Sequence, residues 1–381
     1  MRKYIIYIFI IINILFLTGC WDYHETEDYA IVSAVSIDKN PVNNYNMVAE
    51  IIDVNPSISG IDFTTRLIES SGETIYDAIR NMIAISSRKL YWSHTSFFIL
   101  SEKIARDGII PILDIVIRDP ETRLNVYFYI SKEQTAKEIL EKQNKIAKVL
   151  NLEFVKTIKS SKFLAKSPHL EAYRILNQLE LNTFSTVLPT IRIEQDDTQT
   201  SAVFTGAAFF KEDKLQGFLE PLDTMKYLFV IDELKSGLLV VNMDDSDKTK
   251  VTLDIFDSQR RLKVNFEDER IKIDVNLLVE AAIGEIDGTK DYTSENGRRL
   301  LKERAEKYLN EEIEIFIKTF QEKHGLDIFN FGDYINKNYP ELWRRIGKNW
   351  DSIFKELNVN VNSDIHLRGS GHLMTPIKEG D

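Results

Sequence analysis

Residues 293–324 have the sequence TSENGRRLLKERAEKYLNEEIEIFIKTFQEKH. Their apolar side chains recur at helical spacing, so we predict one helix, about 45 Å long at a rise of about 1.5 Å per residue. Gly325 follows directly and is expected to end the helix. An apolar stripe of this kind packs on the face of a sheet. The residues expected on the stripe are Leu301, Ala305, Tyr308, Ile315 and Phe316.

Predicted strands lie on both sides of this helix. Residues 236–242, 249–256, 261–266 and 270–284 precede it, and residues 359–367 follow it after short helices. Strands, a long helix, short helices and a final strand in this order predict an α+β arrangement with the helix laid across one face of a sheet.

The first part of the chain is predicted to mix strands and helices. Residues 29–38 and 45–54 are rich in β-branched side chains and flank Asn40-Pro41 and Asn43-Asn44, so they are expected to form a hairpin. A helix is expected from Ser71-Gly72-Glu73 to about Ser86. The elements expected next are a strand at 90–100, helical segments at 102–118 and a strand at 123–130.

The middle of the chain is predicted to be helical and rich in lysine from Lys132 to about Leu181, with an interruption at Ser167-Pro168. A strand follows at 184–194, and the polar residues 196–200 suit a linker or a hairpin tip. Residues 202–211 and 214–219 are expected to form a second hairpin that turns at Glu212-Asp213.

These elements predict a multi-domain α+β protein, with mixed and antiparallel sheets flanked by helices and one long helix near the C-terminus. The ranges expected are a signal peptide at 1–19, an N-terminal α/β domain at 20–131, a helix-rich middle domain at 132–199, and a C-terminal α+β domain at 200–381 with its helix at 293–324.

The N-terminus has the outline of a bacterial signal peptide. Arg2 and Lys3 are basic, and residues 4–17 form an apolar run too short for a membrane-spanning helix. Leu17-Thr18-Gly19-Cys20 then resembles the lipobox of bacterial lipoproteins, in which the cysteine is lipidated and becomes the first residue. We therefore expect a protein held by its lipid on the outer face of a bacterial membrane.

Cys20 is the single cysteine of the chain, so this chain alone cannot build a disulfide or a cysteine-based zinc site. A diacylglyceryl group carries two acyl chains, and each buried methylene contributes about 0.8 kcal/mol, so two chains give stable anchoring. Trp21 and Asp22 follow and are expected near the membrane. The Trp21 ring suits the headgroup level, and docking of this tether on the protein body explains it equally well.

The charge of the chain argues against nucleic acid as a partner. Without residues 1–19 the chain has 46 Lys and Arg against 59 Asp and Glu, a formal charge of −13. Binding to phosphate backbones takes a basic surface, and the basic residues here are interspersed with acidic ones. Anionic headgroups also repel such a body on average, which leaves the acyl group as the main attachment.

Motifs of catalysis are absent from the sequence, which has no His-Glu-x-x-His, Gly-x-Ser-x-Gly, Walker-type or Gly-x-Gly-x-x-Gly pattern. The six histidines are scattered singly, so we predict no enzyme, no metal and no cofactor. A charged set at predicted strand and helix ends is expected to form salt bridges within the fold; it comprises Arg88, His94, Arg118, Asp119 and Arg123.

Taken in order, these residues resemble the Ger(x)C family, the lipoprotein C subunits of GerA-type spore germinant receptors. Gly19-Cys20-Trp21-Asp22 and Ile37-Asp38-Lys39 look like the family's mature N-terminus. The other residues that carry the resemblance are Arg88, His94, Arg118, Asp119, Arg123, Gly206, Gly217, Phe331, Gly332, Pro340, Trp343, Arg368 and Gly369. Phe218 stands where the family often has tryptophan, which affects only local packing.

The resemblance implies three mixed α/β domains and a role without chemistry. It implies a lipoprotein that works with an A subunit and a transporter-like B subunit at the spore inner membrane, where all are needed for the response to nutrients. The sequence does not decide whether this chain binds a small molecule. The alternatives are a solute-binding lipoprotein that delivers a ligand to a transporter, and an extracytoplasmic hydrolase with acidic catalytic residues.

Overall fold

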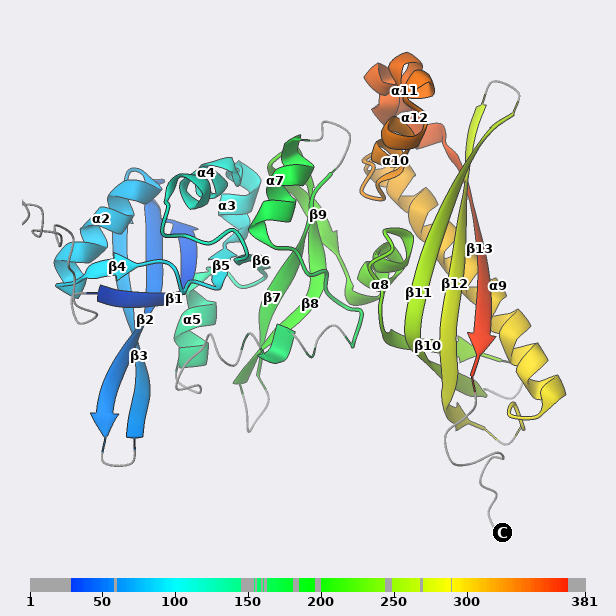
Figure 1. Cartoon of the computed structure of the whole chain (residues 1–381), viewed down its shortest axis with the longest axis horizontal. Coiled ribbons are helices and arrows are strands. Elements are labelled where there is room, and N and C mark those ends of the chain that lie inside the picture. Colours follow the sequence, from blue (N-terminus) through cyan, green and yellow to red (C-terminus); the bar gives the residue numbers. More distant parts are fainter. Residues whose placement is uncertain are drawn as a thin grey trace, which may run out of the picture.

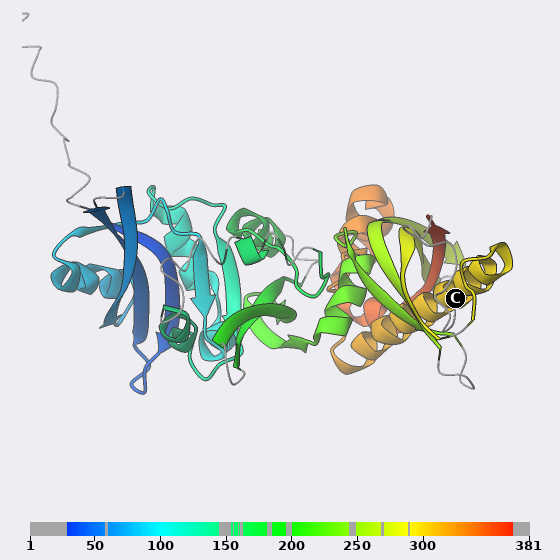
Figure 2. The same ribbon diagram turned by 90° about the horizontal axis from the view of Figure 1, so that it is seen from below.

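The computed structural model describes residues 29–57, 60–144, 154, 156–158, 160, 163–180, 185–195, 200–243, 249–267, 270–288 and 290–368. Two sheets follow one another along the longest axis of the molecule, and the first is built from residues 29–219 (Figure 1). Figure 2 shows the same end-to-end order from below. The fold thus has the mixed α and β content that the sequence predicts, in an elongated body.

The first sheet contains parallel strands at its centre and antiparallel hairpins at both edges. Its strands are β1 (Tyr29–Lys39), β2 (Tyr45–Ser57), β3 (Gly60–Gly72), β4 (Lys89–Tyr91), β5 (Phe97–Leu100), β6 (Tyr127–Ser131), β7 (Val187–Gln195), β8 (Thr200–Lys211) and β9 (Lys214–Leu219). Their order is β3-β2-β1-β5-β6-β7-β8-β9, with β4 paired to β1. β1, β5, β6 and β7 are parallel, whereas β3, β2 and β1 at one edge and β7, β8 and β9 at the other pair antiparallel.

Helices cover both faces of this sheet. α2 (Ile75–Ser86), α3 (Glu102–Asp107), α4 (Ile110–Arg118) and α7 (Ala172–Glu180) lie over one face, and α5 (Lys137–Asn144) lies over the other (Figure 1). Successive side chains of a strand point to opposite faces. Val35 of β1 accordingly packs in the core under α2, α3, α4 and α7, while its neighbour Ala34 packs in the core under α5. Both residues are fully buried, so the sheet is apolar on two sides here.

The second sheet has helices of very different lengths around it. Its strands β10 (Gly237–Asn242), β11 (Lys250–Glu267), β12 (Arg270–Asp287) and β13 (Asn358–Leu367) pair in that order. The long helix α9 (Glu295–Lys323) lies along one face, and α8 (Pro221–Val230) precedes the sheet in sequence. Three short helices lie at one end of α9 (Figure 1); they are α10 (Phe331–Asn338), α11 (Pro340–Ile346) and α12 (Trp350–Glu356).

The long helix begins and ends close to the predicted residues. Ser294 accepts a hydrogen bond from the Gly297 N–H at its start, and Gly325 has φ +61 just after its end. Leu301 and Ala305 are buried as predicted, but Ile315 is 59% exposed. The prediction for Ile315 is wrong. The buried stripe includes the next residue, Phe316, and because successive residues lie about 100° apart around a helix, Ile315 points away from the core. Within the described residues, no helix is long and apolar enough to cross a bilayer.

Side chains of α9 close the free edge of β13. Three backbone N–H groups of the strand each donate a hydrogen bond of 2.8 Å to a side-chain oxygen of the helix: Val361 to Glu314, Ser363 to Asn310 and Ile365 to Glu306. Four residues of helix rise about 6 Å and two residues of strand about 6.6 Å, so the two spacings match. Unpaired edge groups invite pairing with another strand. This helix therefore satisfies the edge within the chain.

Several elements differ from the sequence predictions. The polar strand β3 and the helix α8 were not predicted at all. Residues 90–100 form two short strands, β4 and β5, instead of one. The predicted strands 249–256 and 261–266 are one continuous strand, β11, whose register shifts at Ile255 and Asp257 while its pairing with β12 continues. A bulge thus stands where the polar residues indicated a break.

The sheets group the chain differently from the predicted domain ranges. Strands of the first sheet come from all three ranges, 20–131, 132–199 and 200–381, because backbone hydrogen bonds join β6 to β7 and β7 to β8. The polar residues after Gln195 therefore connect two strands of one hairpin. In the structure the first sheet ends with β9, and α8 leads to the second sheet.

A shared apolar core joins the two sheets. Phe209 of β8 lies opposite Gly217 of β9, and its ring centre is 4.9 Å from that of Phe320 and 4.7 Å from that of His324, both of the α9 region. A Cβ atom at Gly217 would lie 2.6 Å from the Phe209 ring. The missing side chain at Gly217 therefore leaves the room in which Phe209 reaches the long helix.

We predict that Gly217→Ala lowers the free energy of unfolding by about 1–3 kcal/mol, because the added methyl group displaces the Phe209 ring. Chemical denaturation of the variant measures this effect. Gly284→Ala in β12 is the matched control, since the nearest atoms to its added Cβ lie at 3.5 Å and 3.8 Å. Equal stability of both variants would show that the ring has room to move.

Candidate functional site

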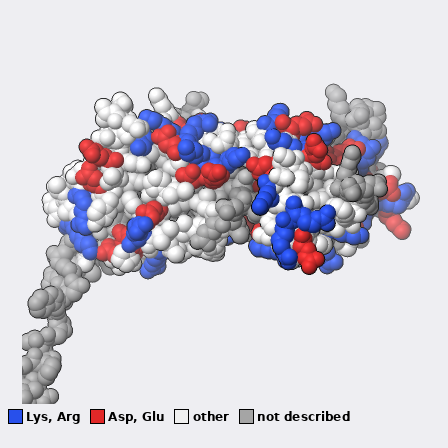
Figure 3. All heavy atoms as spheres, turned by 90° about the horizontal axis from the view of Figure 1, so that it is seen from above, with Lys and Arg blue, Asp and Glu red and all other residues white. Residues whose placement is uncertain are grey.

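A groove of about 510 Å³ lies between α2 and α4 on the first sheet. Apolar side chains form its floor, and they are Ile79, Ile83, Leu90, Trp92 and Ile115. Charged side chains on its rim are Arg80, Lys89, Asp114, Arg118, Asp119 and Glu121. Figure 3 views the face of the molecule that carries α2, α4 and α7, where acidic and basic groups are interspersed among uncharged ones.

Two members of the predicted charged set, Arg118 and Asp119, line this groove, and the other three do not. Arg88 Nη1 lies 3.9 Å from Asp53 Oδ1, and Arg118 Nε lies 2.7 Å from Asp114 Oδ2. Asp119 Oδ1 accepts a hydrogen bond of 2.8 Å from the Glu121 N–H. The other two members, His94 and Arg123, are exposed, and the His94 ring centre is 5.9 Å from that of Tyr91. Two arginines thus lie beside carboxylates, as the sequence analysis expected.

Two basic groups of the rim, Lys89 and Arg118, are held in their charged forms by neighbouring carboxylates. Lys89 donates a hydrogen bond of 2.6 Å to Glu121, which raises the pKa of Lys89. The hydrogen bond to Asp114 likewise raises the pKa of Arg118. A general acid or base needs a pKa near the working pH, and these shifts lead away from it. The groove suits contact with apolar and charged side chains of a protein segment.

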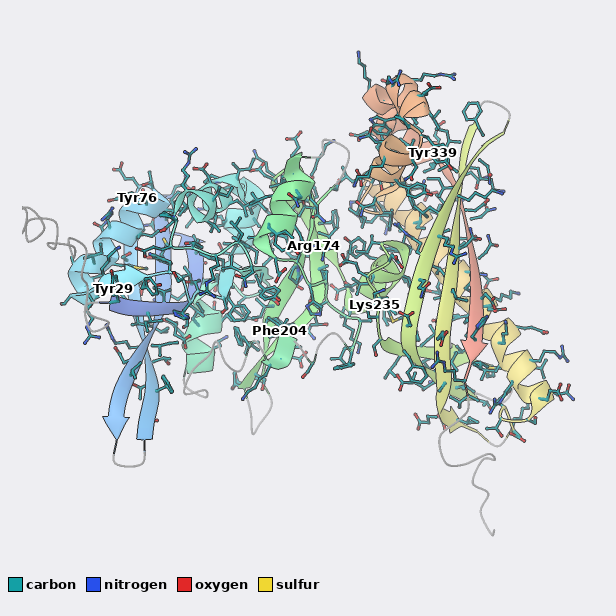
Figure 4. The ribbon with its side chains drawn as sticks, in the orientation of Figure 1. Tyr29, Tyr76, Arg174, Phe204, Lys235 and Tyr339 are labelled. Carbon is teal, nitrogen blue, oxygen red and sulfur yellow. The ribbon has the colours of Figure 1, made fainter. Side chains whose placement is uncertain are left out.

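A second cavity, of about 360 Å³, lies where the two halves of the chain meet. Arg174 of α7 forms an ion pair with Glu233, which follows α8. Burial lowers the pKa of Arg174, but the Glu233 carboxylate raises it by more, so the pKa lies above its usual value. Lys235 lines the same cavity, and Figure 4 shows Arg174 and Lys235 near this junction. The ion pair ties the two halves together.

A buried carboxylate organises the short helices. Asp327 accepts four hydrogen bonds, from the backbone N–H groups of Phe329, Phe331 and Gly332 and from Nε1 of Trp350. Burial raises its pKa to about 6, although the four hydrogen bonds favour the carboxylate. Two of the backbone donors belong to the start of α10, where N–H groups lack partners within a helix. Asp327 therefore fixes this start and binds it to α12.

The glycines near this carboxylate make room for tryptophan rings. A Cβ atom at Gly332 would lie 2.7 Å from Nε1 of Trp350, whose side chain is 4% exposed. A Cβ atom at Gly347 would lie 2.6 Å from the Trp343 ring. The two tryptophan ring centres are 5.5 Å apart. Gly332 and Trp343, which carry the family resemblance, therefore belong to one packed aromatic cluster.

A second buried carboxylate, at the end of β1, accepts the backbone N–H groups at the start of α5. Asp38 accepts hydrogen bonds of 2.8 Å and 3.0 Å from the N–H groups of Ala136 and Lys137. Burial raises the pKa of Asp38. A negative charge at a helix start is also favoured by the helix dipole. Asp38 thus joins the first strand to the helix that covers its sheet.

The other predicted residues are spread through the fold. Gly206 has φ +80 and no room for a Cβ, which would lie 2.9 Å from the Leu219 carbonyl oxygen. Pro340 occupies the first turn of α11, and Arg368 pairs with Glu280 beside β12. Phe331 is fully buried. The residues that lie outside the described part of the chain are Cys20, Trp21, Asp22 and Gly369.

Sequence reasoning missed Asp327 and Trp350. The signal available was Asp327-Ile-Phe-Asn-Phe-Gly332, because an acidic residue just ahead of a helix start often accepts its N–H groups. Nothing in the sequence joins this segment to Trp350, which comes 23 residues later. No group of three or more His, Cys, Asp or Glu side chains placed to hold a metal occurs among the residues described.

Two family models match the chain one after the other. The model described as "Spore germination protein N-terminal domain" matches residues 22–193. The model described as "Spore germination B3/ GerAC like, C-terminal" matches residues 205–371. Together they extend over most of the chain, in the order that the family resemblance requires.

Curated proteins of similar sequence also match this chain over nearly its whole length. Spore germination protein KC of Bacillus subtilis (strain 168) is 25% identical over 99% of this chain and 98% of its own length. Spore germination protein B3 of the same organism is 22% identical, covering 94% and 96%. The crystal structure of the GerBC protein matches with a TM-score of 0.56 and 18% identity, covering 87% of this chain and 96% of that one. The fold is therefore shared along nearly the whole length.

We predict that Asp327→Ala lowers the free energy of unfolding by roughly 3 kcal/mol or more, because four buried N–H groups lose their acceptor. Urea denaturation measures the loss. Asp351→Ala is the control, since Asp351 pairs with Lys211 through exposed side chains. A loss no larger than that of the control would contradict the role assigned to Asp327.

The raised pKa of Asp327 predicts a pH effect of definite sign. Because the folded-state pKa of about 6 exceeds the unfolded value of 3.8, the folded protein binds the proton more tightly. The contribution of this group to stability is therefore largest below pH 3.8 and falls by roughly 3 kcal/mol as the pH rises through the folded pKa. Denaturation of the native chain and of Asp327→Asn at several pH values measures it. A stability difference independent of pH would refute it.

Proposed function

Since the chain belongs to the Ger(x)C family of spore germination proteins, we propose that it acts in spore germination as a non-catalytic subunit of a nutrient germinant receptor. In this proposal it is a lipoprotein of the spore inner membrane that works with an A and a B subunit and is required for the response to nutrients. The match of both family models in succession, over residues 22–193 and 205–371, is the observation that supports it most strongly.

The likeness extends to the architecture as a whole. Spore germination protein GerQC of Bacillus cereus, for example, is 22% identical over 97% of this chain and 99% of its own length. The sequence similarity to this germination protein thus covers the residues of both sheets and of the junction between them. A role shared with them can therefore involve surfaces at both ends of the molecule.

The proposed anchor lies close to the first sheet. Cys20 precedes Tyr29, the first residue of β1, by nine residues, which extend to about 30 Å at most. A lipid on Cys20 would therefore keep the first sheet beside the bilayer, while the second sheet lies at the far end of the elongated body (Figure 1). The two ends would then offer different surfaces to integral neighbours.

The described side chains support a role in binding. Carboxylates in the groove, at the junction and at the short helices are engaged in ion pairs or backbone hydrogen bonds. Catalytic carboxylates need access to a substrate in a pocket. The buried carboxylates Asp38 and Asp327 instead hold helix starts, which gives them a structural task.

The solute-binding alternative rests on the cavity at the junction. Two α/β lobes with regular βαβ units are typical of such proteins. Here only the first sheet has parallel central strands; β10, β11 and β12 are antiparallel, and β13 joins them in parallel. Thermal stabilisation by a small nutrient would favour this alternative, because a ligand of the folded state raises the unfolding temperature.

We predict that Cys20→Ala releases the protein from the spore membrane fraction and abolishes germination in response to one class of nutrients. Loss of the acyl chains removes the main attachment of an acidic body. Immunoblots of membrane and soluble fractions, and the optical density of spores after addition of nutrients, measure both effects.

Two controls accompany this experiment. Lys307→Ala on the exposed side of α9 should leave location and germination unchanged. A trigger that bypasses nutrient receptors should still germinate the Cys20→Ala spores. Spores that lack the whole protein yet respond normally to all nutrients would refute the proposed function.

A further inference from the structure

The first described residue of the chain lies at the rim of the α2–α4 groove. Tyr29 pairs with Lys89 in the parallel register of β1 and β4, and Lys89 lines the groove. The Tyr29 ring centre lies 5.3 Å from that of Tyr91, and Lys89 Nζ lies 5.6 Å from the Tyr29 ring centre. Figure 4 shows Tyr29 and the α2 residue Tyr76 at the same end of the molecule. Whatever precedes Tyr29 therefore starts beside the groove.

The groove offers apolar surface to a segment of that kind. Its floor includes Ile79 and Ile83 of α2 and Ile115 of α4, and the large side chain of Trp92 lies beneath at 5% exposure. Tyr76 on the rim is 54% exposed. A volume of about 510 Å³ lies in the range that holds small ligands or a few side chains.

The eight residues before Tyr29 have the composition that this surface accommodates. Residues 21–28 have the sequence WDYHETED, with two aromatic and four acidic residues and no lysine or arginine. Eight residues extend to about 26–29 Å, which is enough to enter a groove that begins beside Tyr29. Arg80 and Arg118 stand on opposite rims, on α2 and α4. Arg118 is already paired with Asp114 and Lys89 with Glu121. Arg80 is therefore the rim group that suits the acidic side chains of the segment.

We propose that residues 21–28 dock within the same chain in the α2–α4 groove. The rings of Trp21 and Tyr23 pack on the apolar floor, and the acidic residues face Arg80, whose guanidinium lies over the Tyr76 ring. Aromatic side chains contribute large buried area at such sites. Because the segment is covalently attached beside the groove, its effective concentration there is high, and even modest contacts suffice to hold it.

This inference goes beyond the proposed lipid anchor and does not depend on it. If Cys20 carries the lipid, a docked tether holds the body at a defined distance and orientation to the bilayer. A flexible tether of the same length would let the body turn freely. Docking itself requires only the groove and the segment.

Disulfide cross-linking of the mature full-length chain in detergent micelles tests the proposal. Tyr23→Cys combined with Arg80→Cys should form an intramolecular disulfide about tenfold faster than Tyr23→Cys combined with Val54→Cys. Val54 is the matched position because it is exposed on β2 near the start of β1, within reach of the same segment, but does not line the groove. Mass spectrometry of the peptides identifies the disulfide and also shows whether Cys20 carries a lipid. Failure of the lipid anchor is thereby distinguished from failure of docking.

Cleavage by a glutamate-specific protease provides a measurement without new cysteines. Docking protects the peptide bonds after Glu25 and Glu27, because the protease cleaves only the undocked segment. Arg80→Glu should increase the undocked population and so accelerate this cleavage several-fold. Arg299→Glu, an exposed substitution on α9, should leave the rate unchanged.

Three results would overturn the proposal. One is equal cross-linking in the two cysteine pairs. Another is a disulfide-linked product at the mass of a dimer, which would assign the groove to a second copy of the chain. The third is a cleavage rate after Glu25 and Glu27 that equals the rate of the free peptide and does not respond to Arg80→Glu.

Discussion

The arrangement of the whole molecule depends on the apolar contact between β8 and α9. The ring of Phe209 crosses from the first sheet to Phe320 and His324 because Gly217 on the neighbouring strand has no side chain in its way. Buried residues of both sheets belong to one continuous core at this point. Close-packed cores resist deformation, so the two ends of the elongated body are fixed relative to one another.

Polar side chains fix the positions of helices and of a strand edge around this core. Asp38 is a buried carboxylate that attaches the start of α5 to β1, which is distant in the sequence. Asp327 accepts N–H groups at the start of the nearby α10 and also joins it to Trp350 of α12. The side chains of α9 satisfy the outer edge of β13 in the same manner. A buried polar group without a partner costs stability, and these bonds therefore specify positions as well as stabilise them.

These features describe a body with two different ends. The α2–α4 groove opens beside Tyr29 at one end, and the second sheet stands away from that end. On the groove rim, Lys89 pairs with Glu121 and Arg118 with Asp114. In the proposed function, such a body would offer separate surfaces to the other subunits of the receptor.

The sequence alone determined what local spacing encodes: the limits of α9, the hairpin of β1 and β2, and the ordered residues that carry the family resemblance. It missed α8, which is apolar on nearly all sides and so has no amphipathic period, and it missed the polar strand β3, which is specified by its pairing with β2. Among site residues, the sequence identified Gly217 and Gly332. It did not show why glycine stands there, which is to leave room for the rings of Phe209 and Trp350. Only the tertiary structure decided these contacts and the bonds of Asp327, because they join residues that sequence spacing does not relate.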